Sequence, residues 1–396
     1  MIPVQLQSRD PAGRAIQPFA LWRLGFRPFY LAASLFASLS VLAWAAQYAG
    51  LVPSYPGGVA SHAHEMVFGF AFAVIAGFLF TAGRNWTNQA TPTGAWLAAI
   101  VGMWLLARVL VFASPGWPAG VANAAFAIAV AIGLGVPLFR SRNRRNYFFV
   151  PLLLAMGAAS LVAQLAIDGV IDVAPRFGVS VGLDLVLFVI AVMGGRVIPM
   201  FTNNGVPGTS PRRTKWIERA ALGGVLLLLA FDVAGVRGAP LATLAALVAL
   251  AHAWRLALWQ PLRTLRVPLV WVLHAAYAWI PVHLVLRALA ELDVVASPLA
   301  THALTIGTIG GMIVGMMTRT ARGHTGRPLR ADGFEIACYL LVLAAAIVRV
   351  LLPLAAPSTY AFAIAGSAVL WSAGFGLYAI RYWPALTRPR LDGKPG

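Results

Sequence analysis

Seven histidines are the residues of this sequence best suited to hold a metal ion. The chain has a single cysteine, Cys338, which excludes a disulfide framework, a cysteine-based zinc site and an iron–sulfur cluster, since each needs at least two thiolates. Neutral imidazole is a good ligand for both iron and copper. The positions of the histidines therefore decide which chemistry the sequence can support.

Two long apolar runs each begin with histidine. His62 and His64 lie at the start of the run 60–82, and His302 lies at the start of the run 299–318. If both runs cross a membrane in the same direction, the rise per residue places the three imidazoles at about one depth. Three imidazoles at one depth are what a haem or copper site requires.

Helix geometry separates the first two histidines. Residues two apart on a regular helix point about 200° apart, so His62 and His64 face one metal only if His62 lies in an irregular start of the helix. Two roles or two metals are therefore favoured. The competing interpretation is a pair of interfacial histidines that cap the helix and bind water or lipid headgroups. His274 is expected about 13 Å deeper than His283, away from the level of the others.

The elements that must position these residues are membrane helices. Only 11% of the 396 residues are charged, against about 25% in soluble proteins, and 60% are hydrophobic. This composition excludes a water-soluble protein, and the even spread of apolar residues excludes a single anchor. We therefore predict an all-α polytopic membrane protein with twelve spanning helices. The twelve runs are 27–48, 60–82, 94–113, 118–139, 148–167, 179–200, 216–234, 239–258, 268–289, 299–318, 334–353 and 360–382.

Charge placement predicts the orientation. The net charge is +18, and Lys and Arg gather in every second connection and at both ends of the chain. The positive-inside rule then places both termini in the cytoplasm, and the histidine level in the outer leaflet. No helix-turn-helix or zinc signature supports nucleic-acid binding, and we read no removable signal peptide. The basic connections follow the second, fourth, sixth, eighth and tenth runs and hold Arg84, then Arg140, Arg142, Arg144 and Arg145, then Arg212, Arg213 and Lys215, then Arg263 and Arg266, then Arg319, Arg322, Arg327 and Arg330.

The chain is expected to form one transmembrane domain over residues 1–396. It comprises a cytoplasmic segment 1–26, twelve helices within 27–382 and a short basic tail 383–396. Gly77, Gly195 and Gly311 recur in the second, sixth and tenth runs at separations of 118 and 116 residues, which suggests three repeats of four helices. Ordinary close packing at small residues explains the same glycines without any repeat.

Four separated motifs carry a resemblance to a known family. They are His62-Ala63-His64-Glu65-Met66 in the second run, Gly194-Gly195-Arg196-Val197-Ile198-Pro199 in the sixth, Trp271-Val272-Leu273-His274 in the ninth, and His302-Ala303-Leu304-Thr305 with Gly323-His324-Thr325-Gly326-Arg327-Pro328 in and after the tenth. In this order the motifs resemble the NnrS family across essentially the whole chain. The resemblance implies a bacterial inner-membrane protein with twelve spans that carries haem and copper and takes part in the response to nitric oxide and nitrosative stress.

The resemblance also narrows the candidate site. The histidine-bearing motifs of the family match at His62, His64, His274, His302 and His324, whereas His252 and His283 match none. The first four of these are the candidate ligands for haem and for copper, with His64 and His302 preferred as the axial pair of a haem; the assignment of copper among them stays open. Glu65, Arg196 and Thr305 are expected to support the ligands, although a carboxylate at Glu65 is also favoured by the helix dipole alone.

The layout suggests a looser analogy. Histidines at the outer ends of the second and tenth of twelve helices are similar to the arrangement that holds the low-spin haem in haem–copper oxidases. This sequence departs from that pattern, because its sixth helix has no histidine and its seventh has no histidine pair. The analogy therefore concerns the helix layout and not an oxygen-reducing centre.

The histidine pattern together with the NnrS resemblance implies a haem- and copper-binding membrane protein that binds nitric oxide at a histidine-ligated centre in the outer leaflet. Whether it converts nitric oxide as a membrane oxidoreductase or senses it stays open, as does the electron donor. The expected partners are the lipid bilayer, nitric oxide and that donor, without nucleic acid. Two alternatives come from other classes: a secondary transporter, which also has many spans and intramembrane charges, and a haem- or copper-handling protein without turnover.

Overall fold

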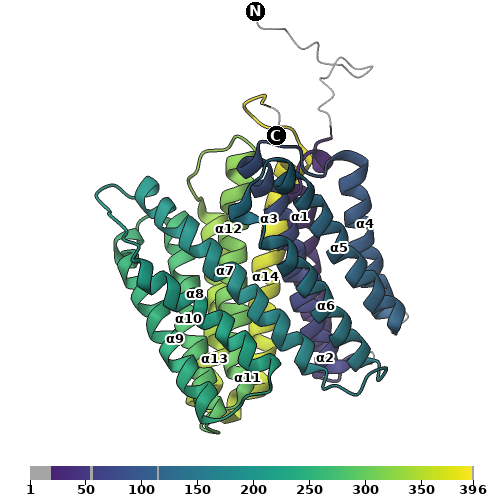
Figure 1. The fold of residues 1–396 in the computed structure, drawn as a ribbon, viewed down its shortest axis with the longest axis vertical. Coiled ribbons are helices and arrows are strands. Elements are labelled where there is room, and N and C mark those ends of the chain that lie inside the picture. Colours follow the sequence, from purple (N-terminus) through teal and green to yellow (C-terminus); the bar gives the residue numbers. More distant parts are fainter. Residues whose placement is uncertain (1–18, 54–56, 114–115, 395–396) are drawn as a thin grey trace, which may run out of the picture.

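The protein is an all-α bundle in the computed structural model, which describes residues 19–53, 57–113 and 116–394 (Figure 1). The predicted segment 1–26 and tail 383–396 lie partly outside these ranges. No β-strand occurs among the described residues. The all-α prediction is confirmed.

The described residues form twelve helical rods, and most rods pack beside their neighbours in the chain. Two of the rods are composite, because α2 continues through a π-helical segment η2 into α3, and α11 continues through a second π-helical segment η5 into α12. The helices are α1 Phe26–Tyr48, α2 Gly58–His64, η2 Glu65–Ala71, α3 Phe72–Thr87, α4 Gly94–Ala113, α5 Trp117–Arg140, α6 Phe149–Ile167, α7 Arg176–Gly205, α8 Lys215–Val233, α9 Ala239–Leu258, α10 Pro268–Glu291, α11 Ser297–His302, η5 Ala303–Gly310, α12 Gly311–His324, α13 Gly333–Ala355 and α14 Tyr360–Thr387.

Eleven of these rods, within the described part of the chain, are long and apolar enough to cross a membrane. The chain is therefore a multi-pass membrane protein. The exception is α8, which the sequence predicts as the seventh span. It is helical and packs between α7 and α9, but Lys215, Glu218, Arg219 and Asp232 make it more charged than the other rods. A membrane crossing by α8 stays a prediction.

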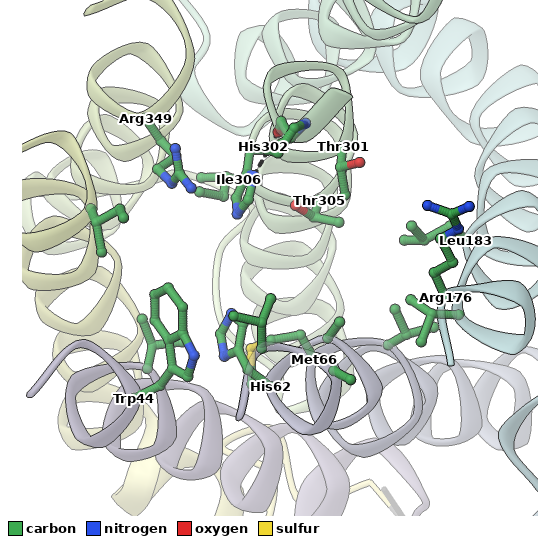
Figure 2. Close-up of a pocket in the computed structure, with 18 of the residues that line it drawn as sticks. Trp44, His62, Met66, Arg176, Leu183, Thr301, His302, Thr305, Ile306 and Arg349 are labelled. Atoms are coloured by element: carbon green, nitrogen blue, oxygen red, sulfur yellow. Dashed lines mark hydrogen bonds between the residues drawn. The ribbon is translucent and has the colours of Figure 1, made fainter. Parts of the chain in front are cut away.

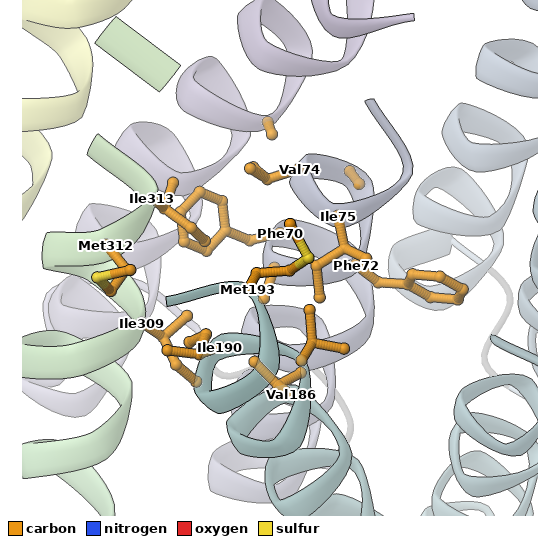
Figure 3. Close-up of a cluster of buried hydrophobic side chains, with 14 of the residues drawn as sticks. Phe70, Phe72, Val74, Ile75, Val186, Ile190, Met193, Ile309, Met312 and Ile313 are labelled. Carbon is orange, nitrogen blue, oxygen red and sulfur yellow. The ribbon is translucent and has the colours of Figure 1, made fainter. Parts of the chain in front are cut away.

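Three rods form the centre of the bundle. The apolar stretches of Gly58–Thr87, Ser297–His324 and Arg176–Gly205 are 83%, 72% and 67% buried, more than those of the other spans. These are the second, tenth and sixth runs of the sequence. Figure 3 shows their apolar side chains meeting, with Phe70 and Ile75 from the first, Ile313 from the second and Ile190 from the third. The other rods surround this core, and α14 packs back on α1 to close the ring.

Both composite rods change helix type directly after a histidine. α2 ends at His64 and η2 starts at Glu65; α11 ends at His302 and η5 starts at Ala303. A π-helical turn holds more residues than an α-helical turn, and such turns are frequent at functional sites. The two rods therefore share an irregularity at the same end, which the regular-helix expectation from the sequence did not include.

The glycines that suggested a repeat lie at close helix contacts. A Cβ at Gly77 would lie 2.8 Å from the Phe29 Cβ on α1, and a Cβ at Gly311 would lie 2.7 Å from the Ala276 Cβ on α10. Small residues at such points let helices approach closely in lipid. Packing alone therefore explains why these positions are glycine.

The helix contact at Gly77 gives a direct test of the packing. We expect Gly77→Val to destabilise the protein by about 1–3 kcal/mol, because the added side chain overpacks the interface with α1. The matched control is Gly102→Val on α4, where a Cβ would meet no heavy atom within 4 Å. Thermal unfolding in detergent measures both variants. Equal stability of the two variants would contradict the central position of this rod.

Candidate functional site

A cavity of about 720 Å³ lies among the ends of the two composite rods, at the end of the bundle opposite to the start of α1. Its wall is mostly apolar. The side chains come from α1, α2 with η2, α7, α11 with η5, α13 and α14. A cavity of this size falls in the range of small-molecule and cofactor sites.

His62 and His302 both point into this cavity, from α2 and from α11 (Figure 2). The Nδ1–H of His302 donates to the backbone oxygen of Pro298 at 2.7 Å, which leaves Nε2 as the unprotonated ring nitrogen. His62 stacks on the indole of Trp44, with ring centroids 4.2 Å apart, and no hydrogen bond joins it to the described residues. One imidazole is therefore fixed by the backbone, and the other is held by an aromatic ring.

His64 lies on the other side of its helix, as the spacing of two residues predicts. It is fully buried, its Nδ1 contacts Glu65 Oε1 at 3.0 Å, and its Nε2 contacts the Ser160 hydroxyl at 3.0 Å. Both ring nitrogens are thus engaged. The structure consequently brings His62, and not His64, beside His302.

Glu65 fixes the side of this rod that carries His64. Its Oε2 lies 2.6 Å from Nε of Arg108 on α4, and Arg108 also donates to Asn123 on α5. All three side chains are buried. A buried ion pair with further hydrogen bonds tolerates a low dielectric, whereas either charge alone does not. Glu65 therefore orients His64 and ties η2 to α4.

The charged groups at the cavity are cations. Arg176 and Arg349 line the wall, and no described carboxylate does. Arg349 is buried, and its Nη2 donates to the Tyr360 hydroxyl at 3.1 Å. Its Nη1 has no hydrogen-bond partner among the described residues. A buried guanidinium nitrogen without a partner is suited to an anionic group in the cavity.

The other histidines lie away from the cavity wall. His274 bonds to the hydroxyl of Thr202 on α7 at 2.8 Å, and His252 bonds to the Tyr277 hydroxyl at 2.7 Å. His283 Nδ1 donates to the backbone oxygen of Ala300, and His324 packs near Phe26 at the end of α12. No group of three or more His, Cys, Asp or Glu side chains with the geometry of a metal site occurs in the part of the chain that is described.

Two of the three expected supporting residues lie elsewhere than the cavity. Thr305 lines the cavity wall from η5. Glu65 supports His64 and not the cavity histidines, and Arg196 belongs to a different hollow near the other end of α7. Sequence reasoning missed Trp44, Met66 and Trp371, which line the cavity; no spacing signal exists for Trp44 and Trp371, because they lie on α1 and α14.

Comparison with known proteins decides the family. The family model described as NnrS protein matches residues 20–390. The chain belongs to the NnrS family. The search of curated proteins gave no match.

The match to the NnrS family model covers every element of the site. The match includes both composite rods, the cavity histidines and the Glu65–Arg108 pair. The resemblance seen in the sequence is confirmed.

The Glu65–Arg108 pair yields a stability prediction. We expect Arg108→Met to destabilise the protein by about 3–5 kcal/mol, because Glu65 is left buried without its cation. The double variant Glu65→Gln, Arg108→Met should recover most of this loss. Thermal unfolding of the two single variants and the double variant gives the coupling energy.

An exposed pair serves as the control for this cycle. Arg381 and Asp332 form an ion pair at 2.8 Å with side chains 46% and 39% exposed, so Arg381→Met should cost less than about 1 kcal/mol. A double variant of the buried pair that is no more stable than Arg108→Met would contradict the assigned role of Glu65.

Proposed function

We propose that this NnrS-family chain is a haem- and copper-binding protein of the bacterial inner membrane that binds nitric oxide in the response to nitrosative stress. The single observation that carries the proposal is the apolar cavity with His62 and His302 in its wall. Family membership and the multi-pass fold are in agreement with it.

The orientation follows from charge. The connections after α3, α5, α7, α9 and α12 lie at the end of the bundle where α1 begins, and these are the Arg-rich connections of the sequence. The positive-inside rule favours the cytoplasm for this end. The cavity then lies toward the outer leaflet, where nitric oxide enters through lipid without a polar channel.

The residues of the cavity fit a haem. His302 presents Nε2, the nitrogen that a metal binds, while its Nδ1–H is anchored to Pro298. The free Nη1 of Arg349 suits a propionate, and the rings of Trp44 and Trp371 suit the face or edge of a porphyrin. Haem iron supplies a coordination position at which nitric oxide binds.

The two histidines have different roles in this proposal. His302, fixed by a backbone hydrogen bond, would be the more firmly placed ligand of a haem. His62 has a ring contact and no hydrogen bond to the described residues, so it would be the more easily displaced of the two ligands. The same two imidazoles, with the soft thioether of Met66 in the same wall, would form an alternative donor set for copper in the absence of haem.

The helix layout belongs to the proposal as well. The second, sixth and tenth runs form the buried centre, and the first and last of these carry the cavity histidines. This supports three repeats of four helices and a layout similar to that of haem–copper oxidases, with the two histidines on the second and tenth helices.

Absorption spectra of the detergent-purified protein test the proposal. The oxidised and reduced haem-supplemented protein should show a Soret band that shifts when nitric oxide is added. We expect His302→Ala to lose most of the haem, and His62→Ala to keep the haem while its spectrum changes to that of a high-spin iron. His64→Ala should keep the spectrum of the parent, because its ring nitrogens bond to Glu65 and Ser160.

The control variant is His324→Ala, which removes an imidazole at the end of α12, the opposite end of the rod that carries His302. A folded, haem-supplemented protein with a featureless spectrum would overturn the haem assignment. Unchanged spectra in both His62→Ala and His302→Ala, together with haem loss in His64→Ala, would instead place the haem at His64.

A further inference from the structure

A second hollow of about 410 Å³ lies at the end of the bundle away from the histidine cavity. It opens between the end of α3, the turn between α5 and α6, and the second half of α7. Neither the proposed haem site nor the family assignment gives it a role. Its wall is formed by Trp86, Asn143, Arg145, Asn146, Met193, Arg196, Val197 and Met200.

Arg196 is held at this hollow by a chain of amides. Its Nη1 donates to Asn146 Oδ1 at 2.6 Å, Asn146 Nδ2 donates to Asn143 Oδ1 at 3.1 Å, and Asn143 Nδ2 donates to the backbone oxygen of Trp86 at 2.9 Å. The guanidinium also lies over the ring of Phe148, 5.8 Å from its centroid. The chain links three separate segments and fixes the position of a half-buried cation.

Most of the guanidinium remains free. Asn146 is the only hydrogen-bond partner of Arg196 among the described residues, and a guanidinium has five N–H donors. Arg145 lines the same hollow, is exposed and makes no ion pair with the described residues. The guanidinium groups of Arg145 and Arg196, both rich in N–H donors, therefore line one hollow.

No described carboxylate neutralises this charge. No described carboxylate lines the hollow, and the acidic side chains at this end of the bundle already form ion pairs with other arginines. Arg213 lies close enough to add to the repulsion on Arg196. The pairs already formed are Glu218 with Arg213 and Arg255, Glu335 with Arg322, Asp332 with Arg381, and Asp392 with Arg390.

We propose that this hollow binds a phosphate group. Planar guanidinium groups bind phosphate oxygens through two parallel hydrogen bonds, and two arginines without carboxylate partners favour an anion over a neutral ligand. The phosphate comes either from the headgroup of an anionic phospholipid or from a small free phosphate. Basic pockets between membrane helices bind such headgroups, and the apolar side chains of Met193, Val197 and Met200 are suited to the start of an acyl chain.

Native mass spectrometry of the detergent-purified protein tests the lipid source. We expect added phosphatidylglycerol to bind more tightly than phosphatidylcholine, and Arg196→Gln to weaken phosphatidylglycerol binding about tenfold or more. Arg145→Gln should weaken it in the same direction. Because Arg145 is exposed, this second variant removes a charge without removing a buried contact.

Inorganic phosphate tests the free source. Its effect on the unfolding temperature of delipidated protein is compared with that of chloride at equal ionic strength. Stabilisation by phosphate that is lost in Arg196→Gln, without a preference for phosphatidylglycerol, assigns the hollow to a small phosphate.

The matched control is Arg266→Gln, an exposed arginine in the connection between α9 and α10 that lies outside the hollow. If Arg266→Gln weakens binding as much as Arg196→Gln, or if neither phosphatidylglycerol nor phosphate binds the parent protein, the proposal is wrong. None of these measurements depends on haem, so their outcome is separate from that of the proposed function.

Discussion

A carboxylate buried in a bilayer is costly unless a cation lies beside it, and this constraint determines how much of the bundle is built. Among the described residues, each buried carboxylate pairs with an arginine from another helix: Glu65 with Arg108, Asp184 and Asp232 with Arg287, and Glu335 with Arg322. The half-buried Glu218 pairs with Arg255 in the same way. These pairs add ionic links between helices that also meet through apolar contacts and a few side-chain hydrogen bonds, such as that from Trp104 on α4 to the Gly69 oxygen on η2. The first pair also fixes which face of the α2–η2 rod is turned toward α4, and so leaves the opposite face, with His62, to the cavity.

Part of the site follows from the sequence by simple geometry. The rise per residue predicts His62 and His302 at one level, and the angle per residue predicts His62 and His64 on opposite faces. In the structure His62 and His302 line one cavity, and His64 contacts Ser160 outside it. The preference for His64 as partner of His302 had no such basis. An apolar helix has no polar stripe that fixes its rotation, so the neighbour that receives each face depends on α4 and α6, which are distant in the sequence.

Other features depend on contacts between distant helices, which the periodicity of apolar residues in the sequence does not predict. The stacking of Trp44 on His62 joins α1 to α2, and the hollow at Arg196 needs the turn after α5 beside α7. The two π-helical segments leave no mark in a pattern of apolar residues, because most of their positions are apolar or glycine, as in the flanking helices. Composition therefore predicted the membrane helices well, while the walls of both cavities required the tertiary arrangement.

Each π-helical segment also separates two α-helices of one rod whose rotations about the rod axis are fixed by different contacts. On the α3 side of η2, the packing of Gly77 against α1 fixes the rotation of α3. At the first residue of η2, the Glu65–Arg108 pair fixes the direction in which the neighbouring His62 points. The wider turn between them absorbs the angular difference, about 100° for each residue gained or lost. A one-residue insertion or deletion in η2 or η5 would therefore turn the cavity side chain of that rod by about 100° around the helix axis, while the buried helix that follows keeps its rotation.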